Sequence, residues 1–356
     1  MTTKARRYRL AIIVIACGVL ITLFSLIQTM KTNSEETAAF ESMEGYVLTS
    51  QGIQKIEQDG DTVEHIAVLE KNDIMSFNIL DNDTLVYSAL LNPADRTQFN
   101  IYLYDLRTKE TKPVFEGTAD IQYTDMLAVG RDSVGVIRHL TAENIHEIIL
   151  FDIATGEEQV VSSPVAEKYI TSWTASPDGR SLAFKGVAND TYYYDRQTQE
   201  VSLIGTFDNV YGFLDSATAW LSNIADDSKM SVYNVKSKQV KPVDFSDDLA
   251  KKTFINGTLL SAGPPEEVLW TVSGFFDTET ASQKIITTDG KDFSVLYDLT
   301  ANGYKFLNTV PSLDESKELV AIDAVNENDQ NVILIVGTSS GKLLNVIEGR
   351  HFVVTS

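Results

Sequence analysis

One short pattern recurs along the chain and constrains its fold more than any other feature. Each copy has an apolar strand, then Asp or Asn, two further residues, Thr or Ser, and a second strand. The Asp or Asn side chain can accept a hydrogen bond from the backbone two residues later, and the hydroxyl residue can do likewise, so the chain reverses. The pattern therefore predicts β-hairpins at IYLYDLRTKETKPV from Ile101, IILFDIATGEEQVV from Ile148, TYYYDRQTQEVSLI from Thr191 and MSVYNVKSKQVKPV from Met230, with weaker copies from Gly45, Lys284 and Val332.

A second series of turn signals lies between the hairpins of the first. Here Asp, Asn or Gly separates two apolar strands. The copies are FNILDNDTLVYSAL from Phe77, MLAVGRDSVGVIR from Met126, WTASPDGRSLAFKG from Trp173, and degenerate forms from Gly212, Thr253 and Thr309. The two series alternate strictly, and comparable turns recur about every 46 residues, which is typical of a four-stranded propeller blade.

The repeats predict an all-β chain that folds as a β-propeller of four-stranded blades. Six full units cover about residues 74–349. Two N-terminal strands at 45–57 and a C-terminal strand at 351–356 remain, and their pairing would form a composite seventh blade without exposed sheet edges. Seven blades is the favoured number, with six or eight as alternatives. A two-sheet sandwich is disfavoured because it needs fewer hairpins than this chain offers.

Residues 172–204 carry the repeat in its fullest form. SWTASPDGRSLAFKG has an inner turn Ser-Pro-Asp-Gly-Arg, and YYYDRQTQEVSLI has an outer turn of the form Tyr-x-x-Asp-x-x-Thr. This combination resembles the TolB-type and WD-like propeller repeats. The resemblance implies a propeller that takes part in protein interactions in a bacterial envelope. Elsewhere the motif is degenerate, since SLDESK at 312–317 lacks the Pro and the Gly.

The apolar segment RLAIIVIACGVLITLFSLIQTM lies near the N-terminus. Residues 10–30 carry no charge, and as a helix with a rise of ~1.5 Å per residue they would span about 31 Å, close to the hydrocarbon core of a bilayer. Cations at 4, 6, 7 and 9 precede the segment, so the positive-inside rule places the N-terminus in the cytoplasm. The sequence thus predicts a cytoplasmic tail at 1–9, a transmembrane signal-anchor helix at 10–30, an acidic polar linker at 31–44 and an extracytoplasmic propeller at 45–356.

Two other interpretations of the apolar segment are retained. A cleavable signal peptide needs a small-residue site shortly after its apolar core, but the nearest candidate ends at Ala39, beyond a charged spacer. Cys17 has suitable neighbours for lipidation in Ala16 and Gly18. A lipoprotein has no need of the apolar run that follows Cys17, so an uncleaved helix is favoured, and the lipidation of Cys17 stays an open question.

The chain is strongly acidic, with a formal net charge of -21 at pH 7. Because Lys4, Arg6, Arg7 and Arg9 precede the apolar segment, about -25 falls on everything after it. Such a surface repels phosphate backbones, which disfavours nucleic-acid binding. It favours a basic protein or peptide of the envelope, or a cation, as partner.

No sequence motif marks a catalytic, cofactor or metal site. The G-x-S-x-G nucleophile elbow is absent, and His65, His139, His146 and His351 lack metal-ligand spacing. GTSSGK at 337–342 has the wrong spacing for a phosphate loop and is interpreted as a hairpin turn. No residue is therefore assigned a catalytic, cofactor-binding or metal-binding role, no cofactor is expected, and the binding residues are unknown.

Two groups of side chains keep a second interpretation. Paired acids could bind calcium through oxygen ligands, but they are interpreted as turn residues because neither pair completes an EF-hand. The pairs are Asp81 with Asp83 and Asp289 with Asp292. The tryptophans lie in or beside expected inner strands and are expected to fill the wedges between blades, with ligand stacking as the alternative. They are Trp173, Trp220 and Trp270.

The sequence favours a non-catalytic module that binds a protein or other ligand of a bacterial envelope and is held outside the membrane by one helix. The alternative is a propeller enzyme, such as a hydrolase or lyase that acts on an extracellular polymer or peptide with its site at the propeller axis. Such an enzyme needs titratable groups from several blades to converge, which no local motif can reveal.

Overall fold

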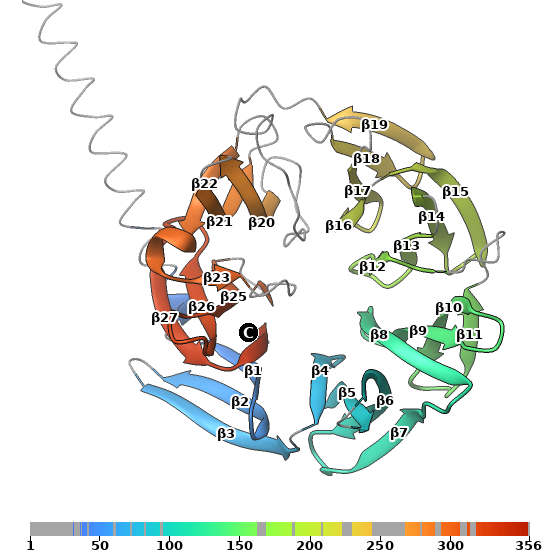
Figure 1. Cartoon of the computed structure of the whole chain (residues 1–356), viewed down its shortest axis with the longest axis horizontal. Helices are drawn as coiled ribbons and strands as arrows, with labels where there is room; N and C mark the ends of the chain where they lie inside the picture. The colour runs from blue at the N-terminus through green and yellow to red at the C-terminus, as the bar shows by residue number, and fades with distance from the viewer. Residues whose placement is uncertain are drawn as a thin grey trace, which may run out of the picture.

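The computed structural model of the chain consists almost entirely of antiparallel β-sheets placed around a ring (Figure 1). It describes residues 31, 36, 38–40, 43–59, 62–71, 73–81, 83–92, 95–161, 169–186, 189–207, 209–222, 230–243, 268–277, 280–288, 293–306, 312–313 and 318–354. Within these residues the strands form seven sheets, the number that the repeats favour. The predicted all-β class with four-stranded antiparallel sheets is confirmed.

Each sheet is one blade, numbered 1 to 7 around the ring. Blade 1 contains β28 (Arg350–Val354), β1 (Glu44–Thr49), β2 (Gly52–Asp59) and β3 (Thr62–Glu70). Blade 2 contains β4 (Ile74–Ile79), β5 (Thr84–Asn92), β6 (Asp95–Asp105) and β7 (Thr111–Phe115). Blade 3 contains β8 (Ile121–Val129), β9 (Ser133–Leu140), β10 (Ile145–Asp152) and β11 (Glu158–Val161).

The remaining blades follow in chain order. Blade 4 contains β12 (Ser172–Ala175), β13 (Ser181–Lys185), β14 (Asp190–Asp195) and β15 (Glu200–Thr206). Blade 5 contains β16 (Asn209–Asp215), β17 (Thr218–Ser222), β18 (Met230–Asn234) and β19 (Gln239–Val243). Blade 6 contains β20 (Val268–Asp277), β21 (Thr280–Thr288) and β22 (Phe293–Asp298), and a 3-10 turn follows at Thr300–Asn302. Blade 7 contains β23 (Lys305–Phe306) and β24 (Ser312–Leu313), which both pair with β25 (Leu319–Val325), then β26 (Asn331–Gly337) and β27 (Leu343–Glu348).

The ring closes through the pairing of the first strand with the last. In the antiparallel β1–β28 pair, Gly45 lies opposite Val354 and Val47 opposite Phe352. Gly45 suits this place because a Cβ there would lie 2.5 Å from the Phe352 ring. The predicted composite blade of residues 45–57 and 351–356 is therefore confirmed as far as residue 354, since 355–356 lie outside the described residues, and β3 completes it as a fourth strand that the repeats do not predict.

The core is a series of apolar wedges between adjacent blades. Middle strands are buried on both faces, and β25 is buried at six of its seven positions, so these strands appear in the sequence as continuous apolar runs. The wedge between blades 2 and 3 packs Val86 and Ile101 against Met126 and Val136. Each blade thus buries its faces only against its two neighbours, as radial repetition requires.

The outer hairpin turns have the predicted chemistry. Oδ1 of Asp105, Asp152, Asp195 and Asn234 accepts the N–H of the residue three positions later, at 2.7, 2.9, 3.1 and 2.9 Å respectively. Asp105 and Asp195 also accept the N–H two positions later, at 2.9 and 2.8 Å. These carboxylates are turn residues, as expected from their spacing.

The outer turn of blade 7 lacks this Asp, and a residue from outside the propeller replaces it. Gly337 occupies the Asp position, since its N–H bonds the Lys342 carbonyl as that of Asp105 bonds the Glu110 carbonyl. The carboxylate Oε1 of Glu36 accepts the N–H groups of Ser339 and Ser340, two and three positions later, at 2.9 and 2.8 Å. Glu36 is only 2% exposed. GTSSGK is therefore a hairpin turn, as predicted, and it binds the carboxylate of Glu36.

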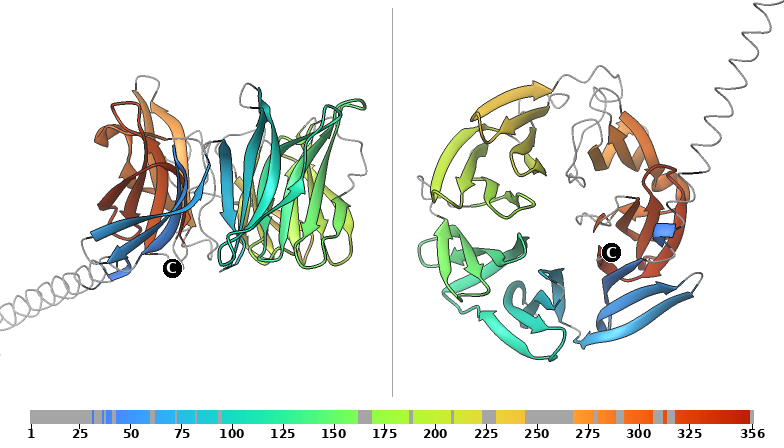
Figure 2. Two further views of the ribbon diagram at one scale, coloured as in Figure 1. Left: turned by 90° about the horizontal axis from the view of Figure 1, so that it is seen from below. Right: turned by 180° about the vertical axis from the view of Figure 1, so that it is seen from behind.

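Glu36 belongs to the predicted linker, and other described residues of this segment also pack on the propeller. Met43 is fully buried in the apolar cluster between blades 1 and 7, and Ala39 and Phe40 pack against the same cluster. Figure 2 shows this segment in blue beside the strands of the last blade. The segment that leads into β1 is thus fastened across the seam where the ring closes.

In the part of the chain that the structure describes, no helix has the length and apolar character that a membrane span requires. The predicted helix at 10–30 and the tail at 1–9 lie outside the described residues.

The substitution Gly337→Asp tests the role of Glu36. An Asp would cap its own turn as Asp105 does, and its Cβ would lie 2.5 to 2.6 Å from the Glu36 carboxylate atoms, so we expect Glu36 to be expelled. Cleavage by a glutamate-specific protease after Glu41 should then accelerate, while the melting temperature changes little. Glu36→Ala should also accelerate cleavage. Because it leaves the turn uncapped, it should lower the free energy of unfolding by about 1 kcal/mol.

Gly117→Ala is the matched control, because a Cβ there meets only ordinary contacts of 3.5 Å or more. Equal protease resistance of Gly337→Asp and the unmodified chain would show that Glu36 does not hold the segment.

Candidate functional site

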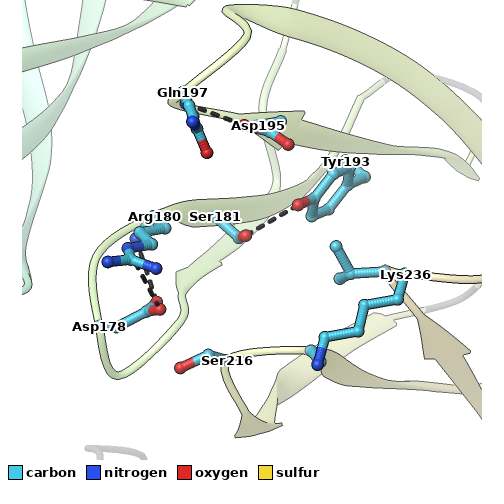
Figure 3. Close-up of a pocket in the computed structure, with 10 residues that line it drawn as sticks. Asp178, Arg180, Ser181, Tyr193, Asp195, Gln197, Ser216 and Lys236 are labelled. Carbon is cyan, nitrogen blue, oxygen red and sulfur yellow. Dashed lines mark hydrogen bonds and ion pairs between the residues drawn. The ribbon is translucent and has the colours of Figure 1, made fainter.

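A groove between blades 4 and 5 is the candidate functional site (Figure 3). It has a volume of about 560 Å³ and lies where four turns meet, β12–β13 and β14–β15 of blade 4, β16–β17 and β18–β19 of blade 5. Its lining residues are Asp178, Arg180, Ser181, Tyr193, Asp195, Gln197, Ser216, Ala217, Val235 and Lys236.

The groove opens on one end of the ring, which we call the turn face. Strand connections alternate between the two ends of a blade, so the turns between first and second strands and those between third and fourth strands share one end. In blade 1 the first two strands are β28 and β1. The chain therefore enters β1 at Glu44, and β28 ends, at the turn face.

The Ser-Pro-Asp-Gly turn forms one wall of the groove. The Ser176 hydroxyl donates to Asp178 Oδ1 at 2.7 Å, and the Arg180 N–H donates to the same oxygen at 3.2 Å. Burial raises the pKa of Asp178, but these hydrogen bonds and one from Ser216 outweigh it and hold the pKa below its ordinary value. Asp178 therefore carries its negative charge at neutral pH.

A pair of hydroxyls forms the floor of the groove. Ser181 Oγ and the Tyr193 hydroxyl share a hydrogen bond of 2.8 Å, and both residues are buried. Burial raises the pKa of Tyr193, and the bond to Ser181 offsets only part of this effect. The floor thus stays neutral at physiological pH and can both donate and accept hydrogen bonds.

The neighbouring groove, between blades 3 and 4, is closed by Arg196. Its guanidinium donates to Asp132 Oδ1 at 3.1 Å and to Ser133 Oγ at 2.6 Å, and it lies 3.7 Å from Asp152 Oδ2. In blade 5 the equivalent residue is Val235, because each follows the capping Asp or Asn of its outer turn. Their N–H groups make equivalent bonds, from Arg196 to the Arg180 carbonyl and from Val235 to the Ala217 carbonyl.

Two of the three acceptors that hold Arg196 have counterparts in the open groove, whereas Arg180 stands where Asp132 stands one blade earlier. Ser133 pairs with Asp152 across β9 and β10, and Ser181 pairs with Asp195 across β13 and β14. Ser181 and Asp195 therefore stand where Ser133 and Asp152 stand one blade earlier. Val235 is too short to reach them, which explains why this groove is open.

A second polar contact lies on the inner strands of blades 3 and 4. Trp173 Nε1 donates to Asp125 Oδ2 at 2.6 Å, and the Trp173 ring packs where a Cβ on Gly135 would lie 2.7 Å from it. Although Asp125 as a residue is exposed, its carboxylate lies against the indole. Burial raises the pKa of Asp125, and the bonds from Trp173 and the Met126 N–H lower it only in part.

Of the tryptophans and paired acids with two possible roles, those that the structure describes lie in the core or in turns. Trp220 is fully buried in β17, as wedge packing requires, and Trp173 lies between blades 3 and 4. The Asp83 N–H bonds Asp81 Oδ1 at 2.8 Å, so this pair forms a turn. Asp289, Asp292 and the side chain of Trp270 lie outside the described residues.

The four histidines do not converge on one site. His139 and His146 form a cross-strand pair with ring centroids 4.6 Å apart. His65 bonds Gln54 at 3.0 Å, and the backbone N–H of His351 bonds Asp323 Oδ2 at 2.7 Å. Among the described residues, no group of three or more His, Cys, Asp or Glu side chains is arranged to hold a metal ion.

Solved structures with a similar fold identify the fold class of this chain. No protein-family model and no curated protein matches the sequence. Among solved structures, TolB from Acinetobacter baumannii aligns with a TM-score of 0.50 and 17% identity over 87% of this chain and 81% of that chain. An oligogalacturonate lyase in complex with manganese aligns with a TM-score of 0.56 and 15% identity over 86% of this chain and 84% of that chain.

The β-propeller domain of the trilobed protease from Pyrococcus furiosus aligns with a TM-score of 0.53 and 12% identity over 78% of this chain and 83% of that domain. At these identities the likeness concerns the fold alone. The chain is a β-propeller of TolB-like fold, which confirms the resemblance that residues 172–204 indicate.

Asp125 gives a test of the contact between blades 3 and 4. Burial raises the pKa of Asp125 in the folded chain above its unfolded value. The folded state is therefore most stable while Asp125 is protonated, and it loses stability as the pH rises through the folded pKa. Asp125→Asn keeps an oxygen for Trp173 Nε1 and removes this cost, so the variant should be at least as stable as the unmodified chain at pH 7. In the unmodified chain, the indole N–H signal of Trp173 in NMR spectra should titrate with a midpoint above 3.8, the ordinary value for Asp. A midpoint at or below that value would contradict the burial of this carboxylate.

Proposed function

We propose that this protein is a non-catalytic binding module of a bacterial cell envelope, held at the membrane by residues 10–30, which binds a protein or peptide partner through the groove between blades 4 and 5. The observation that carries the proposal is the groove itself. It is open where the preceding groove is filled by Arg196. Its walls are turns fixed by their own hydrogen bonds, so a ligand would meet a preorganised surface.

The direction of the chain supports a partner near the membrane. The N-terminal segment joins β1 at the turn face, which also carries the groove. Glu36 and Met43 fasten this segment against blades 1 and 7. With residues 10–30 in the bilayer, the turn face would be directed to the membrane side of the propeller, where membrane-associated partners are concentrated.

A propeller enzyme is the second candidate, and Asp125 is the observation that favours it. Asp125 lies on the innermost strand β8 and accepts a hydrogen bond from Trp173 of the next blade, and burial raises the pKa of its carboxyl group, the direction that suits a general acid. The fold does not separate the two candidates, because propellers serve both as scaffolds and as enzymes. If the enzyme hypothesis holds, Asp125→Asn should abolish turnover of a wall or peptide substrate and leave partner capture unchanged.

Photo-crosslinking in cells tests the binding groove. A benzoylphenylalanine probe in place of Gln197, in the turn that lines the groove, should crosslink a discrete partner. The control probe replaces Arg107, which has the equivalent position in the outer turn of blade 2. Capture by both probes, or by neither, would contradict a partner site at this groove.

The mass of the native N-terminus tests the membrane anchor. The uncleaved helix predicts that the chain is extracted only with detergent and keeps residues 1–30. A chain that begins at Cys17 with added acyl mass would replace the helix by a lipid anchor, and a chain that begins after Ala39 would remove the anchor.

A further inference from the structure

The groove between blades 4 and 5 shares a serine and a carboxylate, Ser181 and Asp195, with the place one blade earlier where an arginine of the chain itself binds. There the Arg196 guanidinium lies among Ser133 Oγ and the carboxylates of Asp132 and Asp152. Planar guanidinium groups favour such sites because their fixed N–H groups can meet several oxygens at once.

We propose that the groove binds the cationic side chain of a partner protein, an arginine in preference to a lysine. This inference rests on the proposed function, since it names the group by which the partner is recognised. Ser181 and Asp195 would take the roles of Ser133 and Asp152. Asp178, two residues before Arg180 in the β12–β13 turn, would supply the second carboxylate, because Arg180 itself has the position of Asp132.

The groups in the groove are already positioned for such a ligand. Oδ1 of Asp195 accepts the N–H groups of Gln197 and Thr198 at 2.8 and 3.1 Å, which fixes the direction of its carboxylate. Ser181 is fixed by the Tyr193 hydroxyl at 2.8 Å. Figure 3 shows both groups on the side of the groove that blade 4 contributes. The partner's cation would therefore meet oxygens that need little reordering.

Two cations of the chain border the groove and limit how strongly it binds. The Arg180 side chain is 80% exposed, and its Nε lies 3.8 Å from Asp178 Oδ2, a distance too long for a hydrogen bond. Lys236 is exposed on the opposite wall, which blade 5 contributes. Two carboxylates and two cations make the groove locally neutral in a chain of net charge -21. Recognition then depends on short-range geometry. We expect the groove to bind a free arginine derivative weakly, and to bind an arginine side chain more tightly when it is part of a protein interface.

The residue at position 235 does not fill this groove as Arg196 fills the preceding one. The corresponding residues of blades 2 and 3 are Leu106 and Ile153, which pack against apolar clusters, and that of blade 4 is Arg196. Val235 has the smallest side chain of the four. It packs against the cluster between blades 4 and 5 and leaves the polar oxygens of the groove to solvent or to a ligand.

The test uses the full chain in detergent micelles and two probes of equal shape. N-acetylarginine methylamide carries a guanidinium, and N-acetylcitrulline methylamide carries a neutral urea in its place. In NMR titrations that follow the methyl groups of Val235 and Ala217, the arginine derivative should bind at least about tenfold more tightly than the citrulline derivative. Equal binding of the two, or no binding of either, would overturn the inference.

Three variants assign the binding to the groove. Val235→Arg should fill the groove as Arg196 fills the preceding one and abolish binding, and the chain should stay folded because blade 4 carries Arg at this position. Asp195→Asn should weaken binding about tenfold while the turn persists, since Asn234 caps the equivalent turn of blade 5. Arg196→Val should open the groove between blades 3 and 4, so that each chain binds two molecules of the arginine derivative in place of one. Unchanged binding in Val235→Arg would overturn the inference.

The crosslinking experiment separates this inference from the proposed function. If the probe at Gln197 still captures its partner in the Val235→Arg background, the partner binds at this face without a cation in the groove, and only the inference fails. If the arginine derivative binds but no partner is captured, the proposed function fails and the cation site remains.

Discussion

The pairing of β1 with β28 is the interaction on which the rest of the structure depends. Each blade buries its middle strands only against its neighbours, so an open ring would expose the apolar faces of blades 1 and 7 to water. The cluster at this seam joins Met43 and Val47 to Phe352 and the strands of blade 7. Glu36 adds hydrogen bonds to the β26–β27 turn of blade 7. The N-terminal segment therefore packs on the same apolar cluster as the closing strands.

A single device, a side-chain oxygen that accepts the N–H groups of an outer turn, recurs around the ring with variations that create sites. In blade 7 the capping residue is Gly337, and Glu36 supplies the oxygen, which docks the segment before β1. The next position along the repeat varies as well. Arg196 closes one groove, and Val235 leaves the following groove open. Substitution at fixed positions of a repeat thus differentiates blades that share one backbone design.

Most of the fold could be predicted because its signals are local. An Asp turn is encoded within six residues, so the hairpins at Asp105, Asp152 and Asp195 followed from the sequence. Strand β3 (Thr62–Glu70) was missed because it is an outermost strand whose described side chains are mostly exposed, which weakens the apolar pattern. The candidate groove was missed because its groups come from four turns. Only the comparison of Arg196 with Val235 at equivalent positions could have pointed to it.

The sequence by itself determined the all-β class, the interleaved hairpins and the composite closing blade, because turn chemistry and the alternation of apolar strands act over short stretches of chain. The tertiary structure decided which groups meet across blades. The Glu36 carboxylate reaches a turn about 300 residues away, and Arg196 reaches Asp132 and Ser133 of the preceding blade. Such contacts depend on how neighbouring blades are placed around the ring, and this placement is fixed by packing in the wedges, which no local pattern encodes.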